Sequence, residues 1–240
     1  MIEISRIEAV GLLWQHSPLL RGAARTLEYM IDNGPIPLTP RKALTRRFVQ
    51  WAAEVFDWPG FSVAELYAVN KVLNEADFPP LVVLHELLVS TKLARHYKDT
   101  LVITKQGRAL ANAPSQLWQL LVDVLLWQTD HGRYMRHHFA FDADWLQVLE
   151  VLNVAAHEGA SEVEICAELL GIDEAEVRRD FVTGLVFYMF VLRPLSWAGL
   201  LAEARADSSL RAETMFVKTP LWPLAWRFAS DELLPKIIVH

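Results

Sequence analysis

Residues 94–110 read ARHYKDTLVITKQGRAL and decide the fold of the first half of the chain. Residues 94–97 and 101–103 have the composition of two short strands, and the polar residues 98–100 between them are typical of a turn. Thr104 follows the second strand at once, and its hydroxyl can cap the first turn of a helix. The stretch therefore predicts a β-hairpin that runs directly into a helix.

Three helices are expected before this hairpin. A Thr-Pro pair starts a helix over residues 39–55, in which apolar residues recur at three- and four-residue steps. Ser62 and Glu65 form a capping box that opens a helix over residues 62–74. Two prolines open a third, nearly all-apolar helix over residues 79–93. Three helices, a hairpin and a further helix are the element order of a winged helix.

The second half of the chain repeats that order. Capping residues predict three helices, over residues 142–156 (from Asp142 or Asp144), 161–170 and 173–186. Residues 187–218 would then hold the second hairpin, enlarged by a polar insertion. Its ending, Phe216-Val217-Lys218-Thr219, echoes the Leu-Val-Ile-Thr of the first hairpin. The halves match in element order more than in residues.

We therefore expect a mainly α protein of two tandem winged-helix-like units, each with a three-helix core and a short β-hairpin. The expected organisation is an N-terminal helical extension at residues 1–34, a first unit with its following helix at 35–128, a linker at 129–143 and a second unit at 144–240. Strands should be few and short, near 94–104 and 187–218, and helices should hold well over half of the residues.

The composition is that of a globular chain. Of 240 residues, 52% are hydrophobic and 22% are charged, and the net charge of −6 comes from residues 131–240, which hold 10 basic and 16 acidic residues. The single Cys166 excludes an intramolecular disulfide, and the first residues do not form a signal peptide, so we expect a cytoplasmic protein. The longest apolar run, Leu185 to Leu192, is closed by Arg193-Pro194 and is shorter than the roughly 20 residues of a membrane span, so no membrane partner is expected.

The first unit resembles a known bacterial region. The resemblance covers about residues 37–112 and rests on Asp77-Phe78-Pro79 before the apolar helix and on LVITKQGRAL at 101–110. This stretch resembles a winged-helix-like region of uncharacterised bacterial proteins. It is similar to the C-terminal part of proteins related to plasmid-borne and insertion-element passenger open reading frames. It implies a winged-helix-like module with no catalytic residues to transfer. The second half departs from the pattern, because Trp222 stands where the first has Gly107.

The histidines are the candidate metal ligands of the chain. His85-Glu86 begins the zinc-peptidase pattern, but Val89 stands where the second histidine is required, so we interpret His85 as a partly exposed residue of a packed helix. His131 and His137 are weak metal candidates, since the adjacent His137 and His138 point about 100° apart on a helix. Without a glycine-rich phosphate loop either, we predict no metal, no cofactor and no catalytic residue.

The remaining signal is basic. Seven residues are candidates for nucleic-acid binding: Arg41, Lys42, Arg46 and Arg47, expected on one helix, and Lys98, Lys105 and Arg108, expected around the first hairpin. A winged helix that reads DNA also needs a polar third helix that reaches base edges. The third helix at 79–93 is nearly all apolar, and its counterpart is acidic over residues 173–180. The basic residues could therefore contact phosphates, but the third helices are unsuited to reading sequence.

We therefore expect a non-enzymatic protein-interaction module whose partner is another protein or a second copy of the chain, with a homodimer favoured. The alternative is a DNA-binding transcriptional regulator that contacts double-stranded DNA through the first unit. A metal-dependent hydrolase that uses the histidines is the third and weakest hypothesis.

The helical spacing also predicts the core. The residues expected to be buried are Trp51, Leu84, Leu87, Leu88 and Val102 in the first unit and Leu149, Leu152, Leu169, Phe181 and Val186 in the second.

Overall fold

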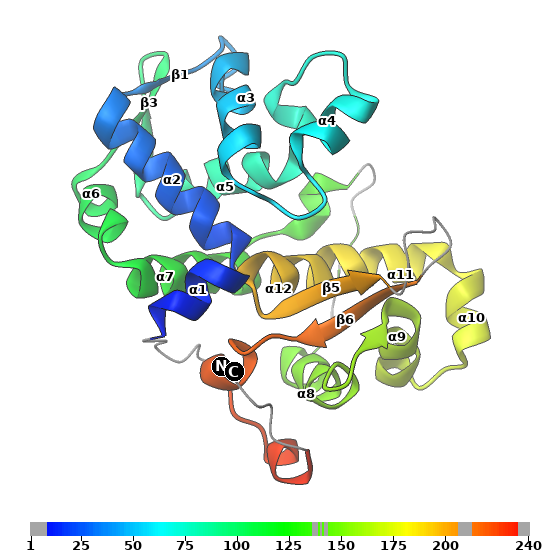
Figure 1. Ribbon diagram of the computed structural model, residues 1–240. Coiled ribbons are helices and arrows are strands. Elements are labelled where there is room, and N and C mark those ends of the chain that lie inside the picture. Colours follow the sequence, from blue (N-terminus) through cyan, green and yellow to red (C-terminus); the bar gives the residue numbers. More distant parts are fainter. Residues whose placement is uncertain (1–8, 136–138, 140, 142–143, 206–212, 235–240) are drawn as a thin grey trace. The chain divides into compact units, whose positions relative to one another are not determined.

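The computed structural model describes residues 9–135, 139, 141, 144–205 and 213–234 (Figure 1). The described residues divide into two compact units, the first formed by residues 9–127 and the second by the described residues from 128 to 234. Most of the described residues are helical and the strands are short, as the sequence predicts.

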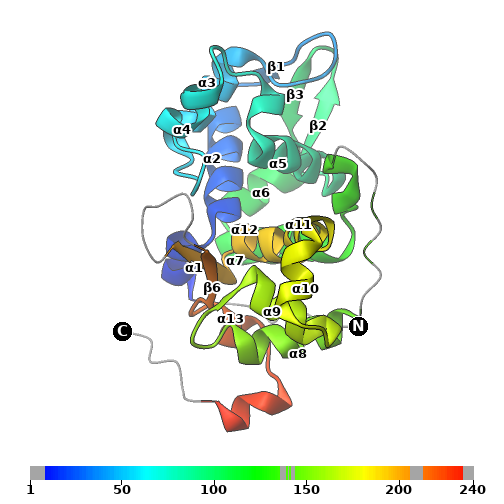
Figure 2. The ribbon, with the colours of Figure 1, turned by 90° about the vertical axis from the view of Figure 1, so that its right-hand side faces the viewer.

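The first unit contains seven α-helices and three strands among its described residues. They are α1 (Val10–His16), α2 (Pro18–Asn33), β1 (Ile36–Pro37), α3 (Arg46–Val55), α4 (Val63–Val69), the 3₁₀ turn η1 (Glu75–Asp77), α5 (Pro79–Ser90), β2 (Ala94–Tyr97), β3 (Thr100–Ile103), α6 (Lys105–Ala111) and α7 (Pro114–Trp127). The predicted hairpin and the helix that follows it are confirmed. Figure 2 shows β2 and β3 side by side next to α5.

The helices that the sequence analysis set apart as an N-terminal extension belong to the first unit. α2 packs against α3, α5, α6 and α7. Its apolar stripe is buried, because Leu20, Ala23 and Leu27 have no exposed surface. α2 is therefore the first core helix of this unit and corresponds in order to α8 (Trp145–Ala155) of the second.

The second unit has the same order of elements. They are the 3₁₀ turn η2 (His131–Tyr134), α8 (Trp145–Ala155), β4 (Ala160–Ser161), α9 (Glu162–Leu170), α10 (Glu174–Arg179), α11 (Phe181–Phe187), the π segment η3 (Tyr188–Leu192), α12 (Arg193–Ala198), β5 (Leu201–Arg205), β6 (Thr214–Lys218), α13 (Trp222–Ala225) and the 3₁₀ turn η4 (Ala229–Leu233). β5 and β6 form the long orange hairpin of Figure 1.

The two sheets share one topology. A two-residue strand near the start of each unit pairs with the last strand of the hairpin, which gives the orders β1-β3-β2 and β4-β6-β5. Both pairings are antiparallel. The short strands β1 and β4 were not predicted, since two residues are too few to show the alternation of a strand.

The two hairpins also share one register. Ala94 pairs with Ile103 in the first, and Leu201 pairs with Lys218 in the second. When these pairs are superposed in sequence, Leu101 corresponds to Phe216. The short strands then agree as well: Ile36 pairs with Leu101 and Ala160 pairs with Phe216. The units therefore correspond residue by residue in their sheets.

A threonine joins hairpin to helix in both units. The Thr104 hydroxyl donates to the Lys92 carbonyl at 2.7 Å and accepts the Gly107 N–H at 3.0 Å. The Thr219 hydroxyl donates to the Gly199 carbonyl at 2.6 Å. Lys92 and Gly199 both end the preceding helix with a positive φ, of 59° and 87°. The predicted echo of the two hairpin endings thus extends to the helix ends that they contact.

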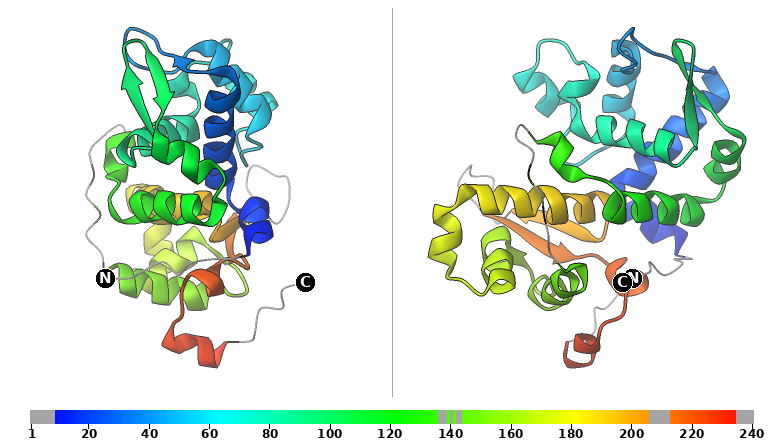
Figure 3. Two further views of the ribbon diagram at one scale, coloured as in Figure 1. Left: turned by 90° about the vertical axis from the view of Figure 1, so that its left-hand side faces the viewer. Right: turned by 180° about the vertical axis from the view of Figure 1, so that it is seen from behind.

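The helix predicted over residues 173–186 is divided in the structure, because α10 ends at Arg179 and a longer helix begins at Phe181. The sequence suggested that Arg193-Pro194 closes the apolar run, but α11, η3 and α12 form one continuous helix from Phe181 to Ala198 (Figure 3, right). Within it the Arg193 N–H bonds to the Tyr188 carbonyl, five residues back, so the widened turn accommodates a proline that cannot donate. This helix is long and apolar enough to cross a membrane by length and composition alone, a test that core helices also pass, and half of it is buried.

Half of the predicted core is buried as expected. Leu84, Leu87, Leu88, Leu149 and Leu152 are each at most 2% exposed. Trp51, Leu169 and Val186 are half-buried. Two assignments need correction. Val102 is half-buried while its neighbours Leu101 and Ile103 face the core, so the strand alternates in the opposite phase. Phe181 is 76% exposed, because α11 turns its first residues to solvent.

Gly107 occupies a crowded position in the first unit. A Cβ added there would collide with the Leu93 carbonyl oxygen and lie 2.9 Å from Ile103 Cγ1. We expect Gly107→Ala to lower the free energy of unfolding by about 1 to 3 kcal/mol in urea denaturation followed by circular dichroism. The control is Gly11→Ala, where an added Cβ meets nothing within 4 Å and should be neutral or stabilise α1 by up to about 1 kcal/mol. Equal effects of the two variants would contradict this account.

Candidate functional site

The four basic residues Arg41, Lys42, Arg46 and Arg47 do not lie on one helix as predicted. α3 begins at Arg46, so Arg41 and Lys42 lie in the preceding loop. Lys42 has a φ of 62°, which a helix does not allow. Thr39 does not cap the helix as predicted, since its hydroxyl accepts the Ala43 N–H at 3.1 Å and closes a turn. The loop, rather than a helix face, therefore presents Arg41 and Lys42 to solvent.

Lys42 attaches this loop to the tip of the hairpin. Its Nζ donates to the Lys98 carbonyl at 2.8 Å and to Asp99 Oδ1 at 3.0 Å. The Leu38 N–H also donates to the Asp99 carbonyl, at 2.8 Å. The ion pair is exposed and so contributes little stability, but it brings three predicted basic residues, Arg41, Lys42 and Lys98, to one edge of the unit.

An aromatic ring with two cations marks the same tip. The Tyr97 ring is half exposed. The Arg95 guanidinium carbon lies 5.2 Å from its centroid and Lys98 Nζ lies 5.5 Å from it. Both distances are within the range of a cation–π interaction. The tip therefore presents a positively charged aromatic surface.

Lys105 and Arg108 lie away from this tip. Both are on α6, which follows the base of the hairpin where Ile103 pairs with Ala94. Lys98 belongs to the turn at the opposite end. The seven basic residues therefore do not converge on one site. Arg47 is exposed on α3, and Arg46 lines a pocket with Lys71, which the sequence analysis did not single out.

A buried hydrogen-bonded chain lies behind the hairpin. Glu75 Oε1 accepts a hydrogen bond from His85 Nδ1 at 2.7 Å, and Glu75 Oε2 accepts the Leu44 N–H at 2.7 Å. Glu75 and His85 are each only 7% exposed. His85 Nε2 lies 2.9 Å from His96 Nε2, so one ring donates to the other. His85 is thus buried and paired, which corrects its interpretation as a partly exposed residue.

The chain connects four segments of the first unit. Glu75 is in η1, Leu44 is in the loop before α3, His85 is in the middle of α5, and His96 is on β2. Partial desolvation of the exposed His96 ring, together with the neighbouring His85 and Lys42, lowers the pKa of His96, and Glu75 opposes this. Because Glu75 has two donors and little contact with solvent, it holds the loop and the third helix together.

The third helices present little that could read DNA bases. Seven of the twelve residues of α5 are buried. Only Pro79 and Ser90, at its ends, are exposed. In the second unit the exposed start of α11 is apolar, with Phe181 76% and Val182 45% exposed. Few exposed polar side chains therefore lie on α5 or at the start of α11, and the acidic residues noted at 173–180 lie mainly on α10.

The histidines do not gather into a metal centre in the described part of the chain. His131 is buried in the second unit, with its ring centroid 6.2 Å from that of Phe190. His137 lies outside the described residues. Among the residues that are described, no three His, Cys, Asp or Glu side chains are placed to hold a metal ion. Cys166 is buried, and burial raises the pKa of its thiol to about 11.

A buried polar cluster in the second unit was missed from the sequence. Asn153 is fully buried, and its Oδ1 accepts from Lys218 Nζ at 2.9 Å and from Trp222 Nε1 at 2.8 Å. Its Nδ2 donates to Ser230 Oγ and Asp231 Oδ1. Burial lowers the pKa of Lys218 to about 8. The cluster joins α8, β6, α13 and η4 through hydrogen bonds to the buried Asn153, so we assign it a role in packing.

Removing the Glu75 carboxylate tests the buried chain. Glu75→Ala leaves the Leu44 N–H and His85 without their acceptor, so we expect a loss of about 2 to 4 kcal/mol in the free energy of unfolding. His96→Ala should cost less than about 1 kcal/mol, because His96 is exposed and His85 can then bond to water. Urea denaturation at pH 7.5 measures both. A loss for Glu75→Ala no larger than that for His96→Ala would show that the carboxylate is not the centre of the chain.

Comparisons with known proteins agree with the division into two units. The family model of the Y4jL N-terminal domain matches residues 15–116, and that of the y4jL C-terminal domain matches residues 135–220. Each match lies within one unit. No solved structure matches the chain.

The alignment with one curated relative covers most of this chain and most of the relative. It is described as the uncharacterized protein y4jL of Sinorhizobium fredii (strain NBRC 101917 / NGR234). It is 40% identical to this chain over 154 residues, which are 64% of this chain and 70% of the relative. With both domain models matched and this relative covered over more than two thirds of its length, the chain belongs to the y4jL family.

Proposed function

We propose that the protein is built of two tandem winged helices. Each unit has the order helix, short strand, helices, hairpin, helix, and in each the first strand pairs with the last. The common register and the threonine junction support one ancestral unit duplicated within the chain. In this assignment α5 and the helix from Phe181 to Ala198 are the helices directly before the hairpin, the position of the helix that DNA-reading members place in the major groove.

We propose further that the protein is a non-enzymatic interaction protein that associates with a second copy of itself through α11. The observation that carries this proposal is the apolar start of α11. Phe181, Val182 and Leu185 are 76%, 45% and 36% exposed. Leu185 lies one helical turn from the other two, so the three side chains share one face. Exposed apolar side chains that gather on one face are typical of a protein interface.

Charge near α11 disfavours nucleic acid as its partner. Glu174, Glu176 and Asp180 are exposed in α10 or at the start of α11. Arg178 is engaged with Glu174 and Glu213. Carboxylates around an apolar face would repel phosphates, whereas they form a suitable polar rim for a protein contact.

Sedimentation velocity at tens of micromolar tests the proposal. We expect the full chain to sediment as a dimer, and the double variant Phe181→Asp, Leu185→Asp to sediment as a monomer, because two buried carboxylates would face each other across the interface. Leu146→Asp is the control, since Leu146 is 52% exposed on α8 of the same unit and should leave the dimer intact. A monomeric parent chain, or a dimer that survives the double substitution, would refute self-association through α11.

A second function is favoured by the tip of the first hairpin. Arg95 and Lys98 flank the exposed Tyr97 ring, and Arg41 and Lys42 lie on the adjoining loop. We propose this as the alternative: the first unit contacts duplex DNA along its phosphates without reading sequence, because α5 offers no exposed polar face.

Fluorescence anisotropy at several salt concentrations tests this alternative. With about four to six phosphate contacts, the logarithm of the binding constant should fall by about 0.9 per contact for each tenfold rise in salt. Arg95→Glu with Lys98→Glu should weaken binding to all sequences alike, whereas Lys105→Glu, at the far end of the hairpin, should have a smaller effect. Absence of binding to duplex DNA in low salt at tens of micromolar protein would remove this function.

A further inference from the structure

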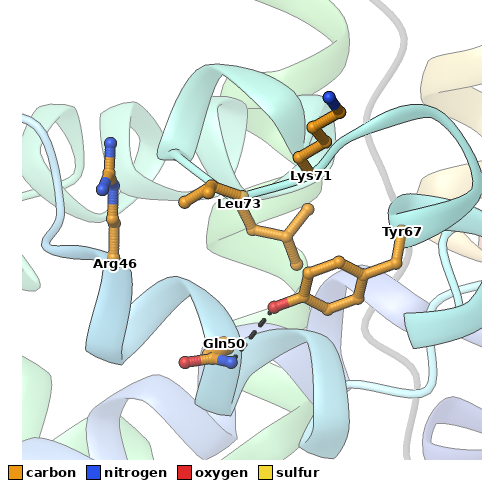
Figure 4. Close-up of a pocket in the computed structure, with 6 residues that line it drawn as sticks. Arg46, Gln50, Tyr67, Lys71 and Leu73 are labelled. Atoms are coloured by element: carbon orange, nitrogen blue, oxygen red, sulfur yellow. Dashed lines mark hydrogen bonds between the residues drawn. The ribbon is translucent and has the colours of Figure 1, made fainter.

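A pocket of about 210 Å³ lies on the first unit between α3 and the segment after α4 (Figure 4). Its lining residues are Arg46 and Gln50 of α3, Tyr67 of α4, and Lys71, Val72 and Leu73 of the following segment. Leu73 is buried and the other five are exposed. The pocket is therefore open to solvent, and a small molecule can reach it.

The pocket is positively charged. Figure 4 shows Arg46 and Lys71 on either side of Leu73, and no carboxylate lines the space between them. Arg46 Nε donates to Asn74 Oδ1 at 2.9 Å, while its two Nη groups and Lys71 Nζ have no hydrogen-bond partner among the described residues. The lining thus offers two full positive charges, with unused donors at the Arg46 Nη atoms and at Lys71 Nζ.

A chain of hydrogen bonds positions the Arg46 guanidinium. Asp77 Oδ2 accepts from the Asn74 backbone N–H at 2.8 Å and from its Nδ2 at 2.9 Å. The Asn74 amide is therefore oriented with its oxygen toward Arg46 Nε. This leaves the Nη edge of the guanidinium free for a ligand, in the fork geometry that matches two oxygens.

The polar groups of the lining are mostly donors. Gln50 Nε2 donates to the Tyr67 hydroxyl at 3.1 Å, so the hydroxyl proton is free to point to a ligand. Gln50 Oε1 is the one lining side-chain acceptor without a partner among the described residues. A ligand rich in acceptor oxygens suits this set better than one rich in donors.

We propose that this pocket binds a small phosphate monoester. Such a group carries about −1.5 to −2 charges at neutral pH and three acceptor oxygens, which match two cations and a hydroxyl. The Arg46 fork would take two of the phosphate oxygens, and the positive charge of Lys71 on the other side of Leu73 would add to the attraction. Val72, Leu73 and the Tyr67 ring supply an apolar wall for one ring-sized group of the ester. This goes beyond the proposed self-association, which involves α11 of the other unit.

Isothermal titration of the full chain with phenyl phosphate tests the proposal. We expect saturable binding of one molecule per chain, and Arg46→Gln and Lys71→Gln should each weaken it about tenfold or more, as expected for a hydrogen bond to a charged group. Arg47→Gln is the matched control, because Arg47 is the next residue of α3 and lies outside the pocket. Arg46→Lys should also weaken binding, since lysine keeps the charge but loses the fork. Unchanged thermal unfolding of each variant shows that the fold is intact.

Several results would overturn the assignment. Equal weakening by Arg46→Gln and Arg47→Gln would show diffuse charge attraction, not a site. Benzoate binding as tightly as phenyl phosphate would assign the pocket to carboxylates. Duplex DNA that displaces phenyl phosphate in an Arg46-dependent manner would assign it to backbone phosphates. Absence of binding at millimolar phenyl phosphate would leave the pocket without this ligand, and the dimer test at Phe181 would be unaffected.

Discussion

The fold of each unit depends on one threonine that holds the base of its hairpin. In the first unit Thr104 bonds to the end of α5 and to the first turn of α6, so a single hydroxyl ties together a helix end, a strand and a helix start. Thr219 bonds in the same way to the carbonyl of Gly199. The last strand of the hairpin runs directly into the next helix, without a loop between them in which the chain could change direction. The helix before the hairpin must therefore end where the threonine can reach it, and this fixes the register of the sheet.

Local signals were enough to predict most elements. Capping residues such as Ser62 and Ser161 begin helices as expected, and both form complete capping boxes. What failed depends on contacts distant in sequence. The loop from Leu38 to Thr45 replaces a predicted helical turn because Lys42 reaches the hairpin tip. The two-residue strand Ile36–Pro37 is too short to show the alternation of a strand in the sequence. It forms because its residues pair with the edge of β3.

The residue types of the candidate sites could be predicted from the sequence, but the positions at which those residues come together could not. The basic residues were evident in the sequence. The structure separates those at the hairpin tip from those on α6, and it places Arg46 and Lys71, which are 25 positions apart and linked by no motif, around one pocket. The bond from Glu75 to His85 was equally hidden, since neither spacing nor composition links a 3₁₀ turn to the middle of the next helix. The apolar start of α11 was visible in the sequence, but Phe181 was predicted to be buried, and its exposure depends on the course of the whole helix.

The widened turn at Tyr188–Leu192 divides one helix into two parts with different exposure. After it, Leu195 and Trp197 are buried; before it, Phe181 and Leu185 face solvent. One extra residue in a turn advances the helical phase by about 100°. Loss of a single codon here would restore a regular helix and rotate the apolar face away from its present direction, with every side chain on that face unchanged. Insertion or deletion of one residue in this turn would therefore create or abolish the exposed apolar face without any substitution on it.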